Sequence, residues 1–491
     1  MEKFVPQTDP NAIGWRIIAS PPLVTAPPRW AAISTQQGRP MLSQLLTIAR
    51  NTYVESVRQP ILLLLVLITG LLQVMNTWTA AFTMGRTSSA EVHGDNKLLL
   101  DVGLGTIFGA GMLMAAFVAT AVISSEIERK TMLTVVSKPI SRTWIVLGKY
   151  LGVAAALTGA VVIMLTFLLM AIRHGVLTTV GEQLDMPVIL FGFGALFGAL
   201  ILAGVANFMY GWSFNQTAIT ALLPLSVMAY IAVLLVSKTW EFQPIMADLP
   251  VKTLTACLTM ILAILVLAAV ATAASTRLGQ VMTIVVCAGV FMGGLLSNYF
   301  LGRQAFTNEV AGVVRAAQPA ETSDPNPSTR GAILEITLRE DARVALAPGM
   351  PFYFGPNPNG FGLTTGNFRP FIGDHTQTPR LFDQDAPPGL IILDATGRQL
   401  LVQNIGRTPL SLDRPPQEDD YFFVTPTRVN PLAATAWAVV PNMHYFWLLD
   451  AVTQNRDIPV SYLSKIVLYA VLQIGAFLAL AVAFFERRDV G

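Results

Sequence analysis

Runs of about twenty uninterrupted apolar residues recur along the chain and constrain its fold more than any other feature. A helix rises 1.5 Å per residue, so about 20 apolar residues span the hydrocarbon core of a bilayer. We predict eight such spans, and none has a charged residue in its interior. The predicted spans are Pro60–Met84, Val102–Ser124, Leu151–Ile172, Pro187–Tyr210, Thr217–Ser237, Thr253–Ser275, Gly279–Phe300 and Lys465–Phe485.

The composition agrees with a membrane environment. Of the 491 residues, 53% are hydrophobic and 13% are charged, whereas soluble domains carry roughly 25% charged residues. The alternative for any single run is a buried helix of a soluble protein, but such helices seldom exceed about 20 residues without a polar face. The chain is therefore predicted to be an α-helical polytopic membrane protein. Spans without charges also argue against an ion-coupled transporter or a charge-selective channel, because both keep ionisable groups at membrane depth.

The orientation of the spans follows from the basic residues. Arginine and lysine gather before the first span and between the second and third spans, and such residues favour the cytoplasmic side. Eight crossings then place both termini in the cytoplasm and the hydrophilic segment from Gly302 to Ser464 outside. The first 40 residues include "PPLVTAPPRW", which predicts a flexible, proline-rich cytoplasmic lead.

The segment 303–462 has the pattern of strands. Runs such as "GAILEITL" and "GLIILDATGRQLLVQNI" are separated by Pro, Gly, Asn and Asp, which are strand and turn signals. We expect an inserted extracytoplasmic β-rich domain, with a sandwich as one candidate, and a loop around "GPNPNGFGLTTGNF". Both cysteines of the chain, Cys257 and Cys287, lie in predicted spans, so we expect no disulfide in this domain.

No pattern in the chain predicts catalysis or cofactor binding. The four histidines, at positions 93, 174, 375 and 444, lack the close spacing of metal ligands. No GxSxG motif follows a strand, and "LGKYLG" at 147–152 lacks the upstream glycine and the hydroxyl residue of a phosphate-binding loop. We therefore predict no catalytic, metal or cofactor residue, no ATP hydrolysis by this chain and no nucleic-acid partner.

Polar and small residues inside the spans have two interpretations. The polar ones can form hydrogen bonds between helices or contact a substrate, and the first role is the commoner one. The small residues lie four apart and predict close helix contacts. The polar residues are Gln73, Asn76, Asn207 and Gln473, and the small pairs are Gly105 with Gly109, Gly148 with Gly152, and Gly194 with Gly198.

The stretch "SSEIERKTMLTVVSKPISRTWIVLGKYLG", residues 124–152, mixes charged and apolar residues between two spans. One interpretation is an amphipathic helix on the cytoplasmic membrane surface. The other is an ordinary loop that obeys the positive-inside rule. The loop accounts for Arg129 and Lys130, but not for Glu126, Glu128 or the apolar residues.

From Glu126 onwards this stretch resembles the cytoplasmic segment of ABC transporter permeases of the type-two exporter class, which includes the copper-enzyme maturation and gliding-motility permeases. In that family an acidic residue, a basic residue and a threonine open a short coupling helix, and a proline turn and a Gly-Lys pair precede the next span. Lys130 departs from the glycine of many members. "LLTIARNTYVESVRQPILLLLVLITGLL" resembles the connecting helix and first span of the family, and "FFERRDVG" resembles its C-terminus. The matching positions are Glu126, Glu128, Arg129, Thr131, Pro139, Ser141, Arg142, Gly148 and Lys149.

The resemblance implies a division of labour in which separate cytoplasmic ABC ATPase subunits hydrolyse ATP and a coupling helix, at about 125–142, passes their movement to the spans. It also implies a homodimer or a heterodimer with a related permease, surrounded by lipid in the inner (cytoplasmic) membrane. The ATPase-coupling interface expected from it is Glu126, Glu128, Arg129, Lys130, Thr131, Pro139, Ser141 and Arg142.

The predicted organisation has four parts: the lead 1–40, a transmembrane domain 41–302 with an amphipathic connecting helix and seven spans, the external domain 303–462, and the last span with its cytoplasmic tail, 463–491. The predicted function is the permease subunit of an ABC transporter, with a substrate that the residues do not specify. The alternative is a non-transporting membrane scaffold that presents an extracytoplasmic binding domain.

Overall fold

The computed structural model describes residues 41–79, 88–128, 141–176, 184–320, 323–360, 362–371, 389–406, 414–448, 452 and 458–487. For the two ends of one long helix, 88–96 and 123–128, it describes the backbone alone. The predicted lead 1–40 lies outside the described residues.

The described part contains eight helices that are long and apolar enough to cross a membrane. The seventh of these continues beyond α10, through a π-helical turn, to Ala305. The prediction of an α-helical polytopic membrane protein with eight spans is confirmed. The eight helices are α3 (Pro60–Thr79), α4 (Ser88–Glu128), α6 (Arg142–His174), α7 (Met186–Tyr210), α8 (Phe214–Leu235), α9 (Val251–Ser275), α10 (Gln280–Ser297) and α15 (Val460–Glu486).

Two helices form the centre of the bundle. In both α6 and α9, 67% of an 18-residue apolar stretch is buried inside the protein, whereas 22% of such a stretch is buried in the span that begins with α10. Small residues let the central helices approach closely: a Cβ at Gly111 of α4 would overlap the Ile264 side chain of α9. The exposed apolar faces of α7, α10 and α15 are typical of helices that meet lipid or another membrane subunit.

Most polar residues of the spans join neighbouring helices, as predicted. The side-chain amides of Gln73 and Asn76 in α3 donate to backbone carbonyls of α4 at 3.0 and 2.8 Å. The amide of Gln473 in α15 donates to the Ala438 carbonyl at 3.1 Å. Asn207 instead closes the end of its own helix by donating to the Trp212 carbonyl at 2.6 Å.

Only one of the three small-residue pairs marks a close helix contact within the described chain. Gly148 and Gly152 of α6 lie directly against α2 (Met41–Arg58), the helix that precedes the first span. A Cβ built at Gly109, Gly194 or Gly198 would meet nothing within 4 Å, and one at Gly105 would meet only the tip of Trp447 at 3.9 Å.

The β-rich segment is a closed six-stranded barrel with the strand order β2-β3-β6-β5-β4-β7, and every pairing in it is antiparallel. The β-rich prediction is confirmed, whereas the sandwich candidate is wrong, because the short strand β7 pairs with both β2 and β4 and closes the sheet. The strands are β2 (Gly312–Pro319), β3 (Ile333–Leu338), β4 (Pro351–Gly355), β5 (Leu390–Thr396), β6 (Gln399–Asn404) and β7 (Tyr421–Phe423).

The barrel is filled by alternating apolar side chains of its strands. Phe352 and Phe422 stack at its centre with ring centroids 5.0 Å apart. A two-residue turn with Gly397 at φ +58° joins β5 to β6, and glycine adopts such a dihedral without strain. The Asp420 carboxylate accepts two hydrogen bonds from Arg414, at 2.6 and 2.8 Å, and these bonds raise the pKa of that guanidinium.

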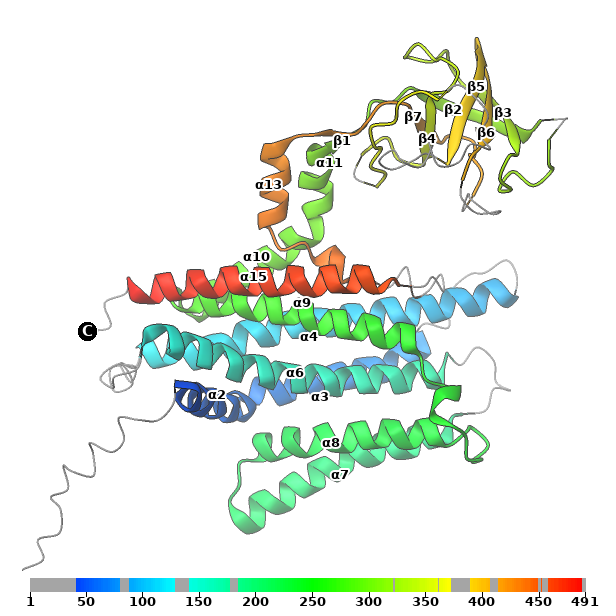
Figure 1. Ribbon diagram of the computed structural model, residues 1–491. Coiled ribbons are helices and arrows are strands. Elements are labelled where there is room, and N and C mark those ends of the chain that lie inside the picture. Colours follow the sequence, from blue (N-terminus) through cyan, green and yellow to red (C-terminus); the bar gives the residue numbers. More distant parts are fainter. Residues whose placement is uncertain are drawn as a thin grey trace, which may run out of the picture.

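Two antiparallel connections, which we call the stalk, join the barrel to the bundle (Figure 1). On the way out, α10 continues through the π-helical turn η4 (Asn298–Gly302) and α11 (Arg303–Ala305) into β1 (Phe306–Thr307). On the way back, β8 (Arg428–Val429) pairs with β1 and leads into α13 (Pro431–Val439) and η5 (Met443–Phe446). The Asn298 side-chain oxygen accepts hydrogen bonds from Trp437 and Asn442, so the two connections are held together.

Figure 1 shows α2 and the C-terminal end of α15 at the same end of the bundle, at the left of the view, and the barrel at the upper right. The strands of the predicted external domain lie between Phe306 and Val429, and the short helices α13 and η5 follow them.

Candidate functional site

The structure describes only part of the predicted coupling interface. Glu126 and Glu128 lie in the last turn of α4, where the backbone alone is described. Arg129, Lys130, Thr131 and Pro139 fall outside the described residues. Ser141 caps the start of α6, where its carbonyl accepts from the Trp144 amide at 3.1 Å, and Arg142 is the first residue of that helix. The two flanks of the coupling segment are therefore defined, and its own helix stays a prediction.

Arg142 connects the start of α6 to the end of α15. Its guanidinium donates to the carbonyls of Phe485 and Glu486 at 3.3 and 3.0 Å, and it lies 5.8 Å from the centroid of the Phe485 ring. The last carbonyls of a helix lack partners within the helix and carry its negative dipole end, so a cation there is stabilising. Arg142 thus has an intramolecular role at this end of the bundle.

Lys149, which was predicted to precede the third span, is a buried cation. Its side chain is 5% exposed, and its ammonium donates to the Val122 carbonyl of α4 at 3.2 Å. Because α6 begins at Arg142 and not at the predicted Leu151, Lys149 lies inside the helix. The one signal for this position in the sequence is the pair of glycines that flank the lysine, Gly148 and Gly152, which mark a close helix contact.

The helix α2 packs against α6 almost backbone to backbone. A Cβ at Gly152 would lie 2.5 Å from the Ala49 carbonyl oxygen, and a Cβ at Gly148 would lie 2.7 Å from Ile48. At both positions the space is therefore too small for any side chain larger than the hydrogen atom of glycine. The far end of α2 is joined to the start of α8, because Arg58 donates to the Gln216 side chain at 2.8 Å. The helix α2 therefore contacts both α6 and α8.

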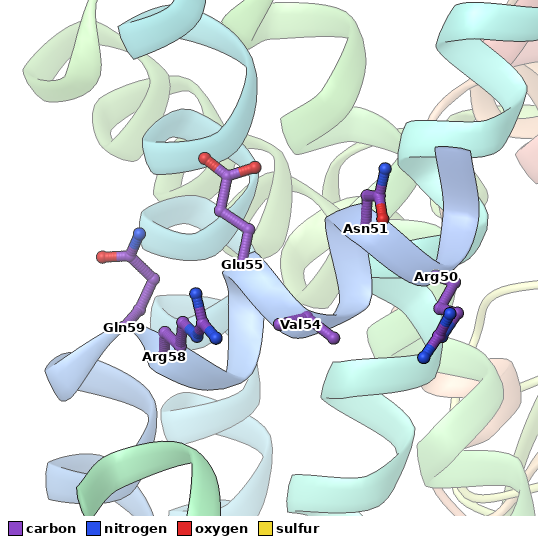
Figure 2. Close-up of a pocket in the computed structure, with 6 residues that line it drawn as sticks. All are labelled: Arg50, Asn51, Val54, Glu55, Arg58 and Gln59. Carbon is purple, nitrogen blue, oxygen red and sulfur yellow. The ribbon is translucent and has the colours of Figure 1, made fainter. Parts of the chain in front are cut away.

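The other side of α2 carries charges of both signs along an open groove of about 440 Å³ (Figure 2). Asn51 and Glu55 project from one side of the helix and Arg50 projects from the other, whereas the Arg58 side chain lies across the front of the helix in this view. The groove is lined by one acidic residue, Glu55, and two basic ones, Arg50 and Arg58. Exposed charges of both signs can form paired contacts with a complementary protein surface.

A second ionic cluster lies at the opposite end of α6 and was missed because each residue falls just outside a predicted span. The guanidinium of Arg173 lies 3.5 Å from a carboxylate oxygen of Asp185 and 3.6 Å from one of Asp248, and it donates to the Val236 carbonyl. Asp185 is fully buried and caps α7 by accepting from the Val188 amide at 3.2 Å. The cluster joins α6, α7 and the connection between α8 and α9, which is a structural role.

Among the residues that the structure describes, no group of three or more His, Cys, Asp or Glu side chains could hold a metal ion. Both cysteines are buried and free.

Residues 101–280 match the family model described as "ABC-2 family transporter protein". The matched segment runs from α4 to the start of α10 and includes the predicted coupling segment between α4 and α6. The match and the eight apolar helices together support a membrane permease subunit of an ABC transporter. No curated protein matches the chain.

Proposed function

We propose that this chain is the permease subunit of an ABC exporter of the type-two class, driven by separate cytoplasmic ATPase subunits that bind the segment 125–142. The family match across this segment carries the proposal. The sequence pattern from Glu126 to Lys149 further favours the subclass of the copper-enzyme maturation and gliding-motility permeases.

The contacts around the coupling segment support a mechanical role. The Lys149 side chain forms a hydrogen bond from α6 to α4, and the Arg142 side chain forms one from α6 to α15. At Gly148 and Gly152, α6 packs closely against α2. A displacement of the segment by a closing ATPase would therefore reach four helices at once. Packed helices switch between discrete arrangements instead of deforming continuously, so a movement at this end can reorganise the bundle.

The permease acts as a pair in this proposal, with a homodimer or a heterodimer above two ATPase subunits. The exposed apolar residues of α7, such as Phe197, Ile201 and Val205, can contact lipid or a second copy of the permease. Three glycines of α7, Gly194, Gly198 and Gly204, have open space beside them, and such positions allow the close approach of another helix.

Purification of the tagged chain from its native membrane in mild detergent tests the proposal. We expect mass spectrometry to identify an ATPase with a phosphate-binding loop among the proteins that purify with it. If no such ATPase accompanies the chain in any of several detergents, the proposed function is wrong.

The proposed topology, with the inner membrane as the location and the barrel outside, gives a separate prediction. A cysteine that replaces Gln318 on the barrel should react with a membrane-impermeant thiol reagent in intact cells, and one that replaces Gln280 at the start of α10 should react only after the membrane is opened. Both positions are exposed, and the native Cys257 and Cys287 are buried, so the background is low. The reverse labelling pattern would refute this topology.

A further inference from the structure

An open cavity of about 280 Å³, whose surface is mainly apolar but includes several polar groups, lies where the stalk meets the barrel. Tyr299 of η4 and Arg303 of α11 line one side of it, in the helix that continues from α10. The loop after β4 contributes Asn357 and Asn359, and η5 contributes His444. The loop belongs to the "GPNPNGFGLTTGNF" stretch, to which the proposed function gives no role. The cavity lies at the opposite end of α10 from the short turn that joins it to α9.

The walls of this cavity are fixed before any ligand binds. The loop is held against the stalk by a bridge between Thr307 and Asn359. At Gly360 it comes so close to the stalk that a Cβ would lie 2.6 Å from the Asn308 side chain. On the other wall, His444 Nε2 donates to the Leu295 carbonyl at 2.6 Å. Preformed polar walls reduce the entropy that a ligand loses on binding.

The helix that continues from α10 changes from α-helical to π-helical geometry at the cavity. The turn from Asn298 to Gly302 is π-helical, and single π-helical turns inside longer helices occur frequently at functional sites. This turn carries Tyr299, and Arg303 follows it directly.

The polar groups of the cavity suit an anion with several acceptor oxygens. The Arg303 guanidinium lies 4.2 Å from the centroid of the Tyr299 ring, and no described carboxylate forms an ion pair with it. The side-chain amides of Asn357 and Asn359 have no hydrogen-bond partner among the described residues. A guanidinium binds phosphate through two parallel hydrogen bonds, and amide groups can donate to the remaining oxygens.

The helix that leads into the cavity presents an apolar surface. Met292, Leu296 and Phe300 are 52%, 43% and 57% exposed, and all lie on the predicted seventh span. An aromatic residue followed by an arginine at the end of a span is typical of the boundary between membrane and water. A phosphate in the cavity can therefore belong to a lipid whose acyl chains lie along α10.

We propose that this cavity binds the phosphate headgroup of an anionic membrane lipid, with Arg303 as the principal ligand. Among the described residues that line the cavity, Arg303 supplies the one permanent positive charge, so the site prefers a lipid with net negative charge to a zwitterionic one. This proposal does not rest on the transport function, because it requires only that the span ends at the membrane surface.

Thermal unfolding of the full chain in a nonionic detergent tests the site, because a ligand that binds only the folded protein raises the unfolding midpoint. We expect short-chain phosphatidylglycerol to raise the midpoint, and phosphatidylcholine or inorganic phosphate at the same concentration to raise it far less. Arg303→Gln should weaken the apparent affinity for phosphatidylglycerol about tenfold or more, since charged hydrogen bonds are lost. Arg303→Lys should retain part of the effect, because it keeps the charge but loses the bidentate geometry.

Arg315→Gln is the matched control, since Arg315 is an exposed arginine on the barrel strand β2 and does not line the cavity. It should leave the response to phosphatidylglycerol unchanged. Native mass spectrometry gives a second readout, in which the anionic lipid that purifies with the chain should be depleted in the Arg303→Gln variant alone.

Three results would overturn the proposal. They are an unchanged response of Arg303→Gln to phosphatidylglycerol, an equal response of the native chain to phosphatidylcholine, and an equal response to inorganic phosphate, which would make the site one for a free anion.

Discussion

Replacement of Glu128 by lysine, or of Arg129 by glutamate, is expected to detach the ATPase subunits from a permease that is still folded. In the proposed function these residues face a complementary surface of the partner, and like charges across an interface cost several kcal/mol. A loss of about 3 kcal/mol corresponds to an association that is roughly 100-fold weaker. Co-purification of the ATPase and transport-coupled ATP hydrolysis measure the effect.

Folding should survive these charge reversals, because they lie between two spans and leave the backbone hydrogen bonds of the spans intact. Arg315→Glu on the barrel is the matched control and should keep the ATPase bound. Full association and coupling in the Glu128 and Arg129 variants would show that the segment is an ordinary positive-inside loop, which is the alternative interpretation of the sequence.

Replacement of Gly152 by leucine is expected to force α2 away from α6. A Cβ at this position would already lie 2.5 Å from both the Ala49 carbonyl oxygen and the Thr52 Cβ, so the backbone of α2 must move. Overpacking of this kind typically costs about 1–3 kcal/mol. We expect a lower unfolding midpoint and faster tryptic cleavage after Arg50 and Arg58, which are both exposed on α2.

Gly475→Leu is the matched control for this change. Gly475 of α15 is also a helical glycine of a span, but a Cβ there would meet nothing within 4 Å. In detergent, the control should therefore have the same unfolding midpoint as the native chain and the same rate of tryptic cleavage. If Gly152→Leu behaved like the control, the close contact of α2 with α6 would not hold this end of the bundle together.

Hydropathy located every span, but it misplaced several span ends. The third span was predicted from Leu151, whereas α6 begins at Arg142. Hydropathy scores a lysine or an arginine as if it faced the bilayer. In the structure, Arg142 bonds to the carbonyls of α15 and Lys149 to a carbonyl of α4, so both cations are accommodated within the helix. Their partners lie far along the chain, and no local window contains them.

The glycine pairs illustrate the same limit. All three have the spacing that favours close helix contacts, yet only Gly148 and Gly152 have a helix against them in the described chain. The partner is the amphipathic α2 and not another span. Spacing reports which residues share a face, and it carries no information about what covers that face.

The sequence by itself determined the membrane class, the number of spans, the presence of a β-rich insertion and the position of the segment proposed to bind the ATPase. These properties follow from hydropathy, charge and turn residues, which act over short windows of the chain. Only the tertiary structure decided that the insertion closes into a barrel, that Lys149 and Arg173 are buried, and that Arg303 shares a cavity with Asn359. Each of these depends on contacts between residues far apart in sequence, and their energy depends on the geometry of the folded chain.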